Sequence, residues 1–192
     1  MFTVKINDKL KKYCWDLVNK YNFWQRWIAD WDKKQQWVGC IGENAIRSML
    51  NKPWLDWKSG FDWWHDINFN WLKIDVKTMW RKTDVKLNYV NNLIWLQKNY
   101  DVDIYIFCSY NFKKSELTIC WWITKEEFFK KASFYKKGQK RYRFDWTYFI
   151  TKADLYEIKN SKLNQVKDQI DLLTQMIAMS SVKNKKEKWK KI

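Results

Sequence analysis

Histidine and paired cysteines, the usual ligands of zinc sites, are scarce in this sequence. Of the 192 residues one is a histidine, His65, which argues against enzyme classes that need two or more histidines around a metal ion. The four cysteines form no Cys-x-x-Cys pair, and two of them lie in apolar, strand-like runs. We therefore expect buried free thiols, and neither a zinc site nor disulfides. These cysteines are Cys14, Cys40, Cys108 and Cys120.

A long uncharged stretch is also missing. No run approaches the roughly 20 apolar residues that a membrane-spanning helix needs. The opening residues, MFTVKINDKLKK, carry charge where a signal peptide would be apolar. We therefore expect a soluble protein with no membrane partner, in the cytoplasm where it is made.

Positive charge is what the chain has in excess. Lysine and arginine number 37 against 21 aspartates and glutamates, which gives a formal charge of +16. Such an excess attracts polyanions, of which nucleic acid is the commonest, although a soluble protein can also be basic without binding one. Some of the 16 tryptophans could stack on bases.

The N-terminal part of the chain predicts helices. Apolar residues recur at roughly helical spacing through residues 1–37, which we expect to form a helical extension. A second helix is expected from Glu43 to Leu50, because Pro53 then ends it.

Strand patterns dominate the middle of the chain. Residues 61–69 and 71–78 predict two strands, joined by a tight turn at Asn68-Phe69-Asn70, because asparagine tolerates the left-handed backbone of such turns. The runs 103–108 and 117–123 are almost continuously apolar, which indicates strands buried on both faces.

Two shorter helices complete the pattern. One is expected at 88–98, and one at 125–132, where Thr124 is the cap and Glu127 completes a capping box. A final short strand is expected at 144–150.

These elements predict an α/β (α+β) fold, with a mixed central sheet of about four to five strands flanked by helices. We expect a single domain over residues 1–160 with its core at 39–132. A C-terminal helix at 161–182 and a solvated basic tail at 183–192 follow it.

The C-terminal helix carries a short heptad pattern. Five aliphatic residues are spaced 3, 4, 3 and 4 positions apart, which covers fewer heptads than a coiled coil needs. The helix either packs on its own domain or forms a homodimer through residues 161–180. The five residues are Leu163, Val166, Ile170, Leu173 and Ile177.

One strand combines an acid and an amine. Side chains alternate faces along a strand, so Leu72, Ile74 and Val76 share the face that the core requires. Asp75 and Lys77 then share the other face, which projects a carboxylate beside an ammonium group. A solvated strand face or a structural salt bridge gives the same pair.

Two further acids join this pair. Asp66 lies nine residues before Asp75, across the expected hairpin, and carboxylates on adjacent strands can meet at one cation. Asp62 is a second candidate on the same strand. Glu43 shares a helical stripe with apolar residues, where a carboxylate is costly unless a cation neutralises it or it reaches water at the edge of the stripe.

The stretch GENAIRSML, followed by HDINFNWLKIDVKT, resembles the PD-(D/E)xK (restriction-endonuclease-like) nuclease superfamily, particularly its small phage and prokaryotic members. The likeness covers residues 39–78 well and later segments more loosely. It implies a restriction-endonuclease-like core and a hydrolase that cleaves phosphodiester bonds in DNA with Mg²⁺ or Mn²⁺.

The resemblance also implies a role for each acid and for the lysine. Asp66 and Asp75 correspond to the metal ligands, and Glu43 to a helical glutamate found in many members. Lys77 corresponds to the lysine that contacts the reacting phosphate or the attacking water. His65 stands where the family often has proline, and we expect it to be a bystander.

Phosphate contacts are expected from basic residues that follow the site strand or lie in the basic stretch 130–143. Binding through them would be independent of sequence and strongly dependent on salt, although a solvated surface is the alternative. The candidates are Arg81, Lys82, Lys136, Lys137, Arg141 and Arg143.

The sequence leaves several functions open. The first is a metal-dependent nuclease, which could be a dimeric enzyme like the Holliday-junction resolvases. The second is a non-catalytic nucleic-acid-binding protein that keeps a nuclease-like core. The third is a structural protein that associates through its C-terminal helix.

Overall fold

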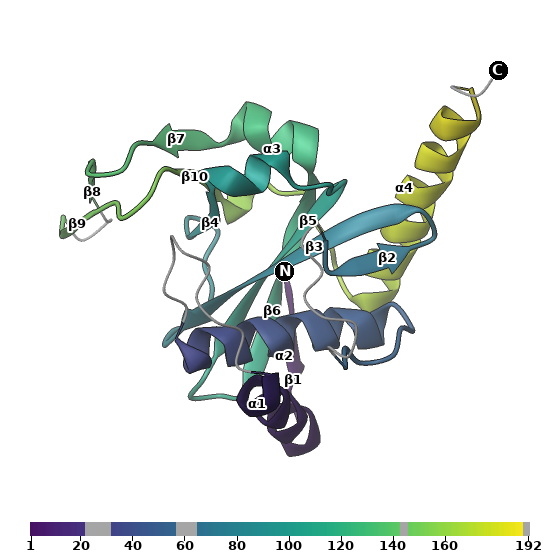
Figure 1. Cartoon of the computed structure of the whole chain (residues 1–192), viewed down its shortest axis with the longest axis horizontal. Coiled ribbons are helices and arrows are strands. Elements are labelled where there is room, and N and C mark those ends of the chain that lie inside the picture. Colours follow the sequence, from purple (N-terminus) through teal and green to yellow (C-terminus); the bar gives the residue numbers. More distant parts are fainter. Residues whose placement is uncertain (22–31, 57–64, 143–145, 190–192) are drawn as a thin grey trace.

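The computed structural model describes residues 1–21, 32–56, 65–142 and 146–189. A five-stranded mixed sheet forms its centre, in the order β1-β6-β5-β3-β2 (Figure 1). Strands β3 and β5 are parallel, and the other neighbours are antiparallel. The strands are β1 (Phe2–Lys5), β2 (Ile67–Phe69), β3 (Leu72–Arg81), β5 (Ile104–Asn111) and β6 (Glu116–Thr124).

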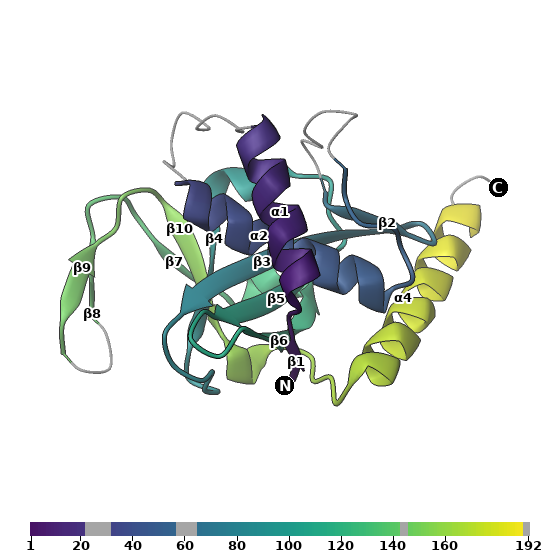
Figure 2. The ribbon, with the colours of Figure 1, turned by 90° about the horizontal axis from the view of Figure 1, so that it is seen from below.

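Helices flank this sheet, so the expectation of a mixed sheet with helices around it is confirmed. Helix α2 lies across one face of the sheet, and α1 packs on α2 (Figures 1 and 2). Helix α3 packs against β6, and α4 lies beside the β2–β3 hairpin. The helices are α1 (Asp8–Tyr21), α2 (Lys33–Met49), α3 (Lys125–Lys131) and α4 (Gln169–Trp189). Within the described residues, none of these helices is long and apolar enough to cross a membrane.

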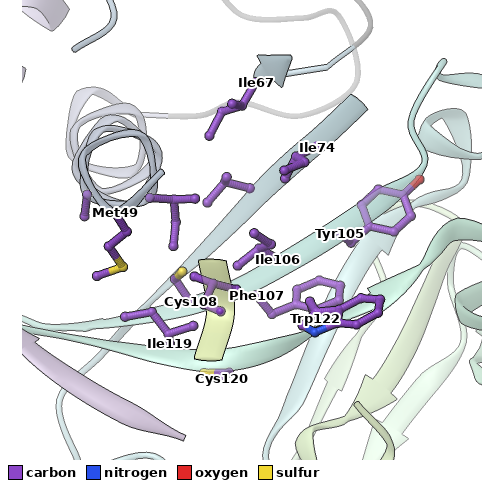
Figure 3. Packing of buried hydrophobic residues seen from close by; sticks show 14 of the residues in the cluster. Met49, Ile67, Ile74, Tyr105, Ile106, Phe107, Cys108, Ile119, Cys120 and Trp122 are labelled. Atoms are coloured by element: carbon purple, nitrogen blue, oxygen red, sulfur yellow. The ribbon is translucent and has the colours of Figure 1, made fainter. Parts of the chain in front are cut away.

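Apolar side chains cover both faces of the central strands. Ile74, Ile106 and Cys108 lie toward Met49 of α2 (Figure 3). Strand β5 is buried at every position, as its continuous apolar sequence predicts. On the opposite face an aromatic cluster forms against α3: the ring centroids of Tyr105 and Phe128 are 5.5 Å apart. All four cysteines are buried and free, as expected.

The hairpin between β2 and β3 positions the strand with the acid and the amine. Its turn residues are Asn70 and Trp71, with φ angles of 45° and 75°, and Phe69 pairs with Leu72. A two-residue loop of this kind needs a positive φ at both positions. The turn predicted near Asn68-Phe69-Asn70 is therefore present and includes Asn70, but it extends to Trp71, and Asn68 and Phe69 belong to β2. Residues 61–64 of the expected strand lie outside the described residues.

Three other predictions of secondary structure were wrong. Residues 2–5 form a strand that pairs with β6, and are not helical. The helix that carries Glu43 begins much earlier, at Lys33, where the carboxylate of Asp32 accepts a hydrogen bond from the Gln35 amide (2.8 Å). The segment 88–98 contains strand β4 (Val90–Ile94) and a 3-10 helix (Trp95–Asn99), because β4 pairs with β10.

Two small sheets lie beside the main one. Strand β10 (Leu155–Lys159) pairs with β4 on one side and with β7 (Ser133–Tyr135) on the other. Strands β8 (Lys140–Tyr142) and β9 (Tyr148–Ile150) form a separate two-stranded ribbon at the edge of the molecule (Figures 1 and 2).

Thr124 caps α3 as expected, since its hydroxyl accepts a hydrogen bond from the Glu127 amide (3.2 Å).

The C-terminal helix differs from the heptad prediction. It begins at Gln169, so Leu163 and Val166 precede it, and the predicted seam is broken. The helix buries Leu172 and Met176 against its own domain and leaves Ile170 and Ile177 exposed. It also continues beyond 182 as far as Trp189, where a tail was expected, and Lys183 forms an ion pair with Asp103 (2.6 Å).

The contact between α2 and β3 leaves no room for a side chain at Gly42. A Cβ atom there would lie 1.8 Å from Oγ1 of Thr78, whereas one at Gly39, in the same helix, would meet nothing within 4 Å. We expect Gly42→Ala to lower the free energy of unfolding by roughly 2 kcal/mol, as overpacked core substitutions do.

The matched control is Gly39→Ala, which should be neutral or stabilise the protein by up to about 1 kcal/mol through helix propensity. Urea denaturation followed by circular dichroism measures both. Equal effects of the two substitutions would contradict the close approach of α2 to β3.

Candidate active site

At the edge of β3, the carboxylate of Asp66 accepts a backbone hydrogen bond that a neighbouring strand would otherwise accept. The Asp66 amide donates to the Ile74 carbonyl (3.0 Å), which continues the pairing of β2 with β3 by one residue. Its Oδ2 then accepts a hydrogen bond from the Val76 amide (2.7 Å). Strand β2 covers β3 only as far as Ile74, so a side chain satisfies the next amide of this edge.

Asp75 and Lys77 form a buried ion pair on β3. The Lys77 ammonium lies 2.8 Å from Oδ1 and 2.7 Å from Oδ2 of Asp75, and the side chains are 4% and 18% exposed. Oδ1 accepts the hydrogen bond, whereas the buried Oδ2 accepts none from the described residues. The alternation of the strand brought this pair together as predicted, but the pair is much less exposed than a solvated strand face.

Glu43 reaches the same region from α2 and is held there by Arg47. The Arg47 guanidinium donates from Nε to Glu43 Oε1 (2.9 Å) and from Nη2 to the Asp66 carbonyl (2.7 Å). Arg47 thus links the helical acid to the start of the hairpin. Sequence reasoning missed this residue, although its position four residues after Glu43 on the helix was the available signal.

Gly42 explains why a helical side chain can lie so close to β3. Because Gly42 has no side chain, α2 lies directly against Thr78, and Glu43 follows at the next position. The close contact at Gly42 thus brings the next residue of the helix, Glu43, near β3.

The acids and Lys77 act on each other electrostatically. Removal from water raises the pKa of Glu43 to about 7; Arg47 opposes this shift, and the charge of Asp75 adds to it. Removal from water, followed by the charges of Asp75 and Glu43, raises the pKa of Asp66 well above its usual value. Lys77 lowers the pKa of both. The four predicted site residues therefore share one electrostatic environment.

The chemistry of this group suits a hard divalent cation. In the described ranges, no group of three or more His, Cys, Asp or Glu side chains is arranged to hold a metal ion. Mg²⁺, however, binds through one or two carboxylates and completes its shell with waters and phosphate oxygens. Asp75 offers a buried carboxylate that it shares with the Lys77 ammonium, and Asp66 and Glu43 contribute further carboxylates nearby.

Two further residues close to Asp66 in the sequence, His65 and Asp62, were given roles in the sequence prediction. Both ring nitrogens of His65 are buried and make no hydrogen bond to a described residue, so its expected role as a bystander remains a prediction. Asp62, the second candidate acid, lies outside the described residues.

Two of the arginines proposed for phosphate contacts are engaged within the protein. Arg81 donates to Ser109 Oγ (3.3 Å) and the Val90 carbonyl (2.9 Å), which ties β3 to β4, and burial lowers its pKa. Arg141 forms an ion pair with Glu157 (2.6 Å). The exposed members of the predicted set are Lys82, Lys136 and Lys137, and Arg143 lies outside the described residues.

Comparison of the chain with models of protein families, with curated proteins and with solved structures gave no match. The resemblance to the PD-(D/E)xK nucleases therefore depends on the sequence motifs within residues 39–78.

The raised pKa values make the stability of the fold depend on pH. Between the unfolded pKa of a glutamate, about 4.3, and the folded pKa of Glu43, about 7, the native state binds more protons than the unfolded state. The free energy of unfolding should therefore fall by up to roughly 3 kcal/mol as the pH rises through this window in the presence of a chelator.

Thermal denaturation at a series of pH values measures this effect. The double variant Glu43→Gln/Asp66→Asn keeps the shapes of both side chains and should lose this part of the pH dependence. A variant profile that runs parallel to the wild-type profile would contradict the shared environment of the acids.

Proposed function

We propose that the protein is a metal-dependent nuclease that hydrolyses phosphodiester bonds, with a restriction-endonuclease-like core. The observation that supports this proposal is the buried Asp75–Lys77 pair beside the carboxylates of Asp66 and Glu43. DNA as the substrate, and Mg²⁺ or Mn²⁺ as the cofactor, are what the resemblance adds.

The charges of this group favour a cation site over a structural salt bridge. Three carboxylates, those of Glu43, Asp66 and Asp75, are arranged around two cationic groups, Lys77 and Arg47. Burial and mutual repulsion make it costly for all three carboxylates to be ionised together, and this cost raises the pKa values of Glu43 and Asp66. Perturbed acids that lie together in this way are typical of functional sites, because a bound cation relieves their repulsion.

Each residue has a defined task in this proposal. Of the acids Asp75, Asp66 and Glu43, one or two would hold the divalent ion directly, with waters and phosphate oxygens completing its shell; when bound, the ion would acidify a water and offset charge on the phosphate oxygens. Lys77 lies beside Asp75 and would stabilise the negative charge that develops on the phosphate during attack. Arg47 holds Glu43 and the Asp66 backbone in place, and so acts as a positioning residue.

Cleavage assays that compare two ion pairs, each with its lysine on β3, test the proposal. Asp75→Asn and Lys77→Met should each lower Mg²⁺- or Mn²⁺-dependent cleavage of DNA by roughly 100-fold or more, since each removes a group that acts on the reacting phosphate. The controls are Asp101→Asn and Lys73→Met, which alter the more exposed ion pair between Lys73 and Asp101 and should leave the rate unchanged.

A chelator should abolish cleavage by the wild-type protein. Full activity of both Asp75→Asn and Lys77→Met would overturn the proposal. Binding of nucleic acid that is sensitive to salt, with no cleavage of any substrate form, would instead favour a non-catalytic binding protein.

A homodimer through the C-terminal helix stays a prediction, and the exposed Ile170 and Ile177 are the residues that could support it. If α4 forms the interface, Ile170→Glu/Ile177→Glu should convert the dimer into a monomer, because it places charge in an apolar contact. Sedimentation equilibrium measures the mass, and Leu87→Glu, another exposed apolar position, is the control. A wild-type protein that is monomeric at all concentrations would rule out the dimer.

A further inference from the structure

The ribbon formed by β8 and β9, here called the arm, presents two different faces. Its register pairs Lys140 with Ile150 and Tyr142 with Tyr148, so these four side chains share one face. The pair between them, Arg141 and Phe149, belongs to the opposite face. The arm projects at the edge of the molecule, away from the five-stranded sheet (Figures 1 and 2).

The first face of the arm is an exposed aromatic surface. Tyr142 and Tyr148 are 52% and 53% exposed, and their ring centroids are 5.9 Å apart. The Lys140 ammonium lies 4.9 Å from the centre of the Tyr148 ring. Trp146, in the connection between the two strands, is 85% exposed. Large aromatic side chains grouped on a surface in this way mark binding sites more often than scattered single ones do.

The second face fixes the arm to the body of the protein. Arg141 forms its ion pair with the buried Glu157 of β10, and its guanidinium lies 4.9 Å from the centre of the Tyr135 ring. At the base, the buried Thr151 accepts a hydrogen bond from the Gly138 amide and donates one through its own amide to the Gln139 carbonyl (2.8 and 3.0 Å). The rings of Tyr142 and Tyr148 are therefore carried by a ribbon that is attached to the body of the protein.

The charge around the arm indicates the kind of partner. Residues 133–152 contain six lysines and arginines and a single acidic residue, Asp145. The lysines at 136, 137, 140 and 152 are exposed. Exposed aromatic rings framed by lysines fit a polyanion that also has flat faces to stack, which describes a nucleic acid with unpaired bases. In a regular duplex the bases stack on one another and present only their edges.

We propose that the arm binds unpaired nucleotides, with bases stacked on Tyr142, Tyr148 and Trp146 and phosphates contacted by the neighbouring lysines. This inference rests on the proposed function, since it names the form of substrate that the nuclease site would receive. Single-stranded DNA, single-stranded RNA and the unpaired positions of a branched DNA all offer this chemistry.

Binding measured without cleavage separates this inference from the proposed function. The Asp75→Asn protein in a chelator is titrated into three labelled probes, and fluorescence anisotropy is recorded. The probes are a single-stranded oligodeoxynucleotide, its duplex and the RNA of the same sequence. Tyr142→Ala/Tyr148→Ala in this background should weaken binding of the single strands by roughly 10-fold or more, because stacking on each ring is lost, and should change duplex binding less than about twofold.

Two controls make the result specific to the arm. Trp95→Ala removes another exposed aromatic side chain outside the arm and should leave all three affinities unchanged. A probe with 2-aminopurine in place of adenine should change its fluorescence when it binds the protein with an intact arm, and not when it binds the double tyrosine variant.

The outcomes are distinct. Equal loss of single-strand and duplex binding, or no loss of either, would overturn the inference. It would also be overturned if sedimentation showed that the double variant had lost a dimer, because the arm would then contact a second copy. If the arm binds DNA and RNA single strands with equal affinity, it recognises bases in general. If it binds one of them more tightly, that nucleic acid is the substrate. The tyrosine variant could lose single-strand binding while the wild-type protein, assayed separately with metal, cleaves no substrate. That combination would support the arm as a binding surface and refute the nuclease.

Discussion

The hydrogen bond from the Val76 amide to the carboxylate of Asp66 determines the geometry of the site. A strand edge normally satisfies its amides with a neighbouring strand or with water. Here a side chain takes that place, directly where the short strand β2 ends. This one interaction brings an acid from the neighbouring strand next to the position that projects Asp75, while the adjacent part of β3 stays free of a strand on that side within the described residues.

A second constraint brings the helix to the same place. The absence of a side chain at Gly42 allows α2 to lie against Thr78, and Arg47 connects Glu43 to the backbone of Asp66. Acids that are distant along the chain are thus positioned by backbone contacts, not only by their own charges.

Much of the site could be predicted from the sequence because it follows local rules. The alternation of β3 placed Asp75 beside Lys77, and the hairpin placed Asp66 across from them. The cap at Thr124 and the buried strand β5 also followed from local pattern. The spacing of Arg47 from Glu43 was visible in the sequence, but its contact with the Asp66 carbonyl, nineteen positions away, is one that no helical pattern reveals.

The errors in the fold prediction have a common cause in long-range pairing. Strand β4 was read as a helix because its sequence alone does not reveal β10, its partner. The heptad spacing of the C-terminal segment was coincidental, since Leu163 and Val166 pack as parts of an irregular segment before the helix. Strand β9 lies within the strand expected at 144–150, but its partner β8 was not predicted, because the short β8 carries exposed residues and no pattern with one buried apolar face.

The pairing of β1 with β6 has a consequence for biosynthesis. Thr3 meets Thr118, a separation of 115 positions along the chain. At ribosomal rates of about 5–20 residues per second, the first strand leaves the exit tunnel roughly ten seconds before its partner is made. During that interval the backbone groups of β1 lack the strand with which they pair, so β1, one of the two edge strands of the central sheet, can dock only after β6 has been synthesised.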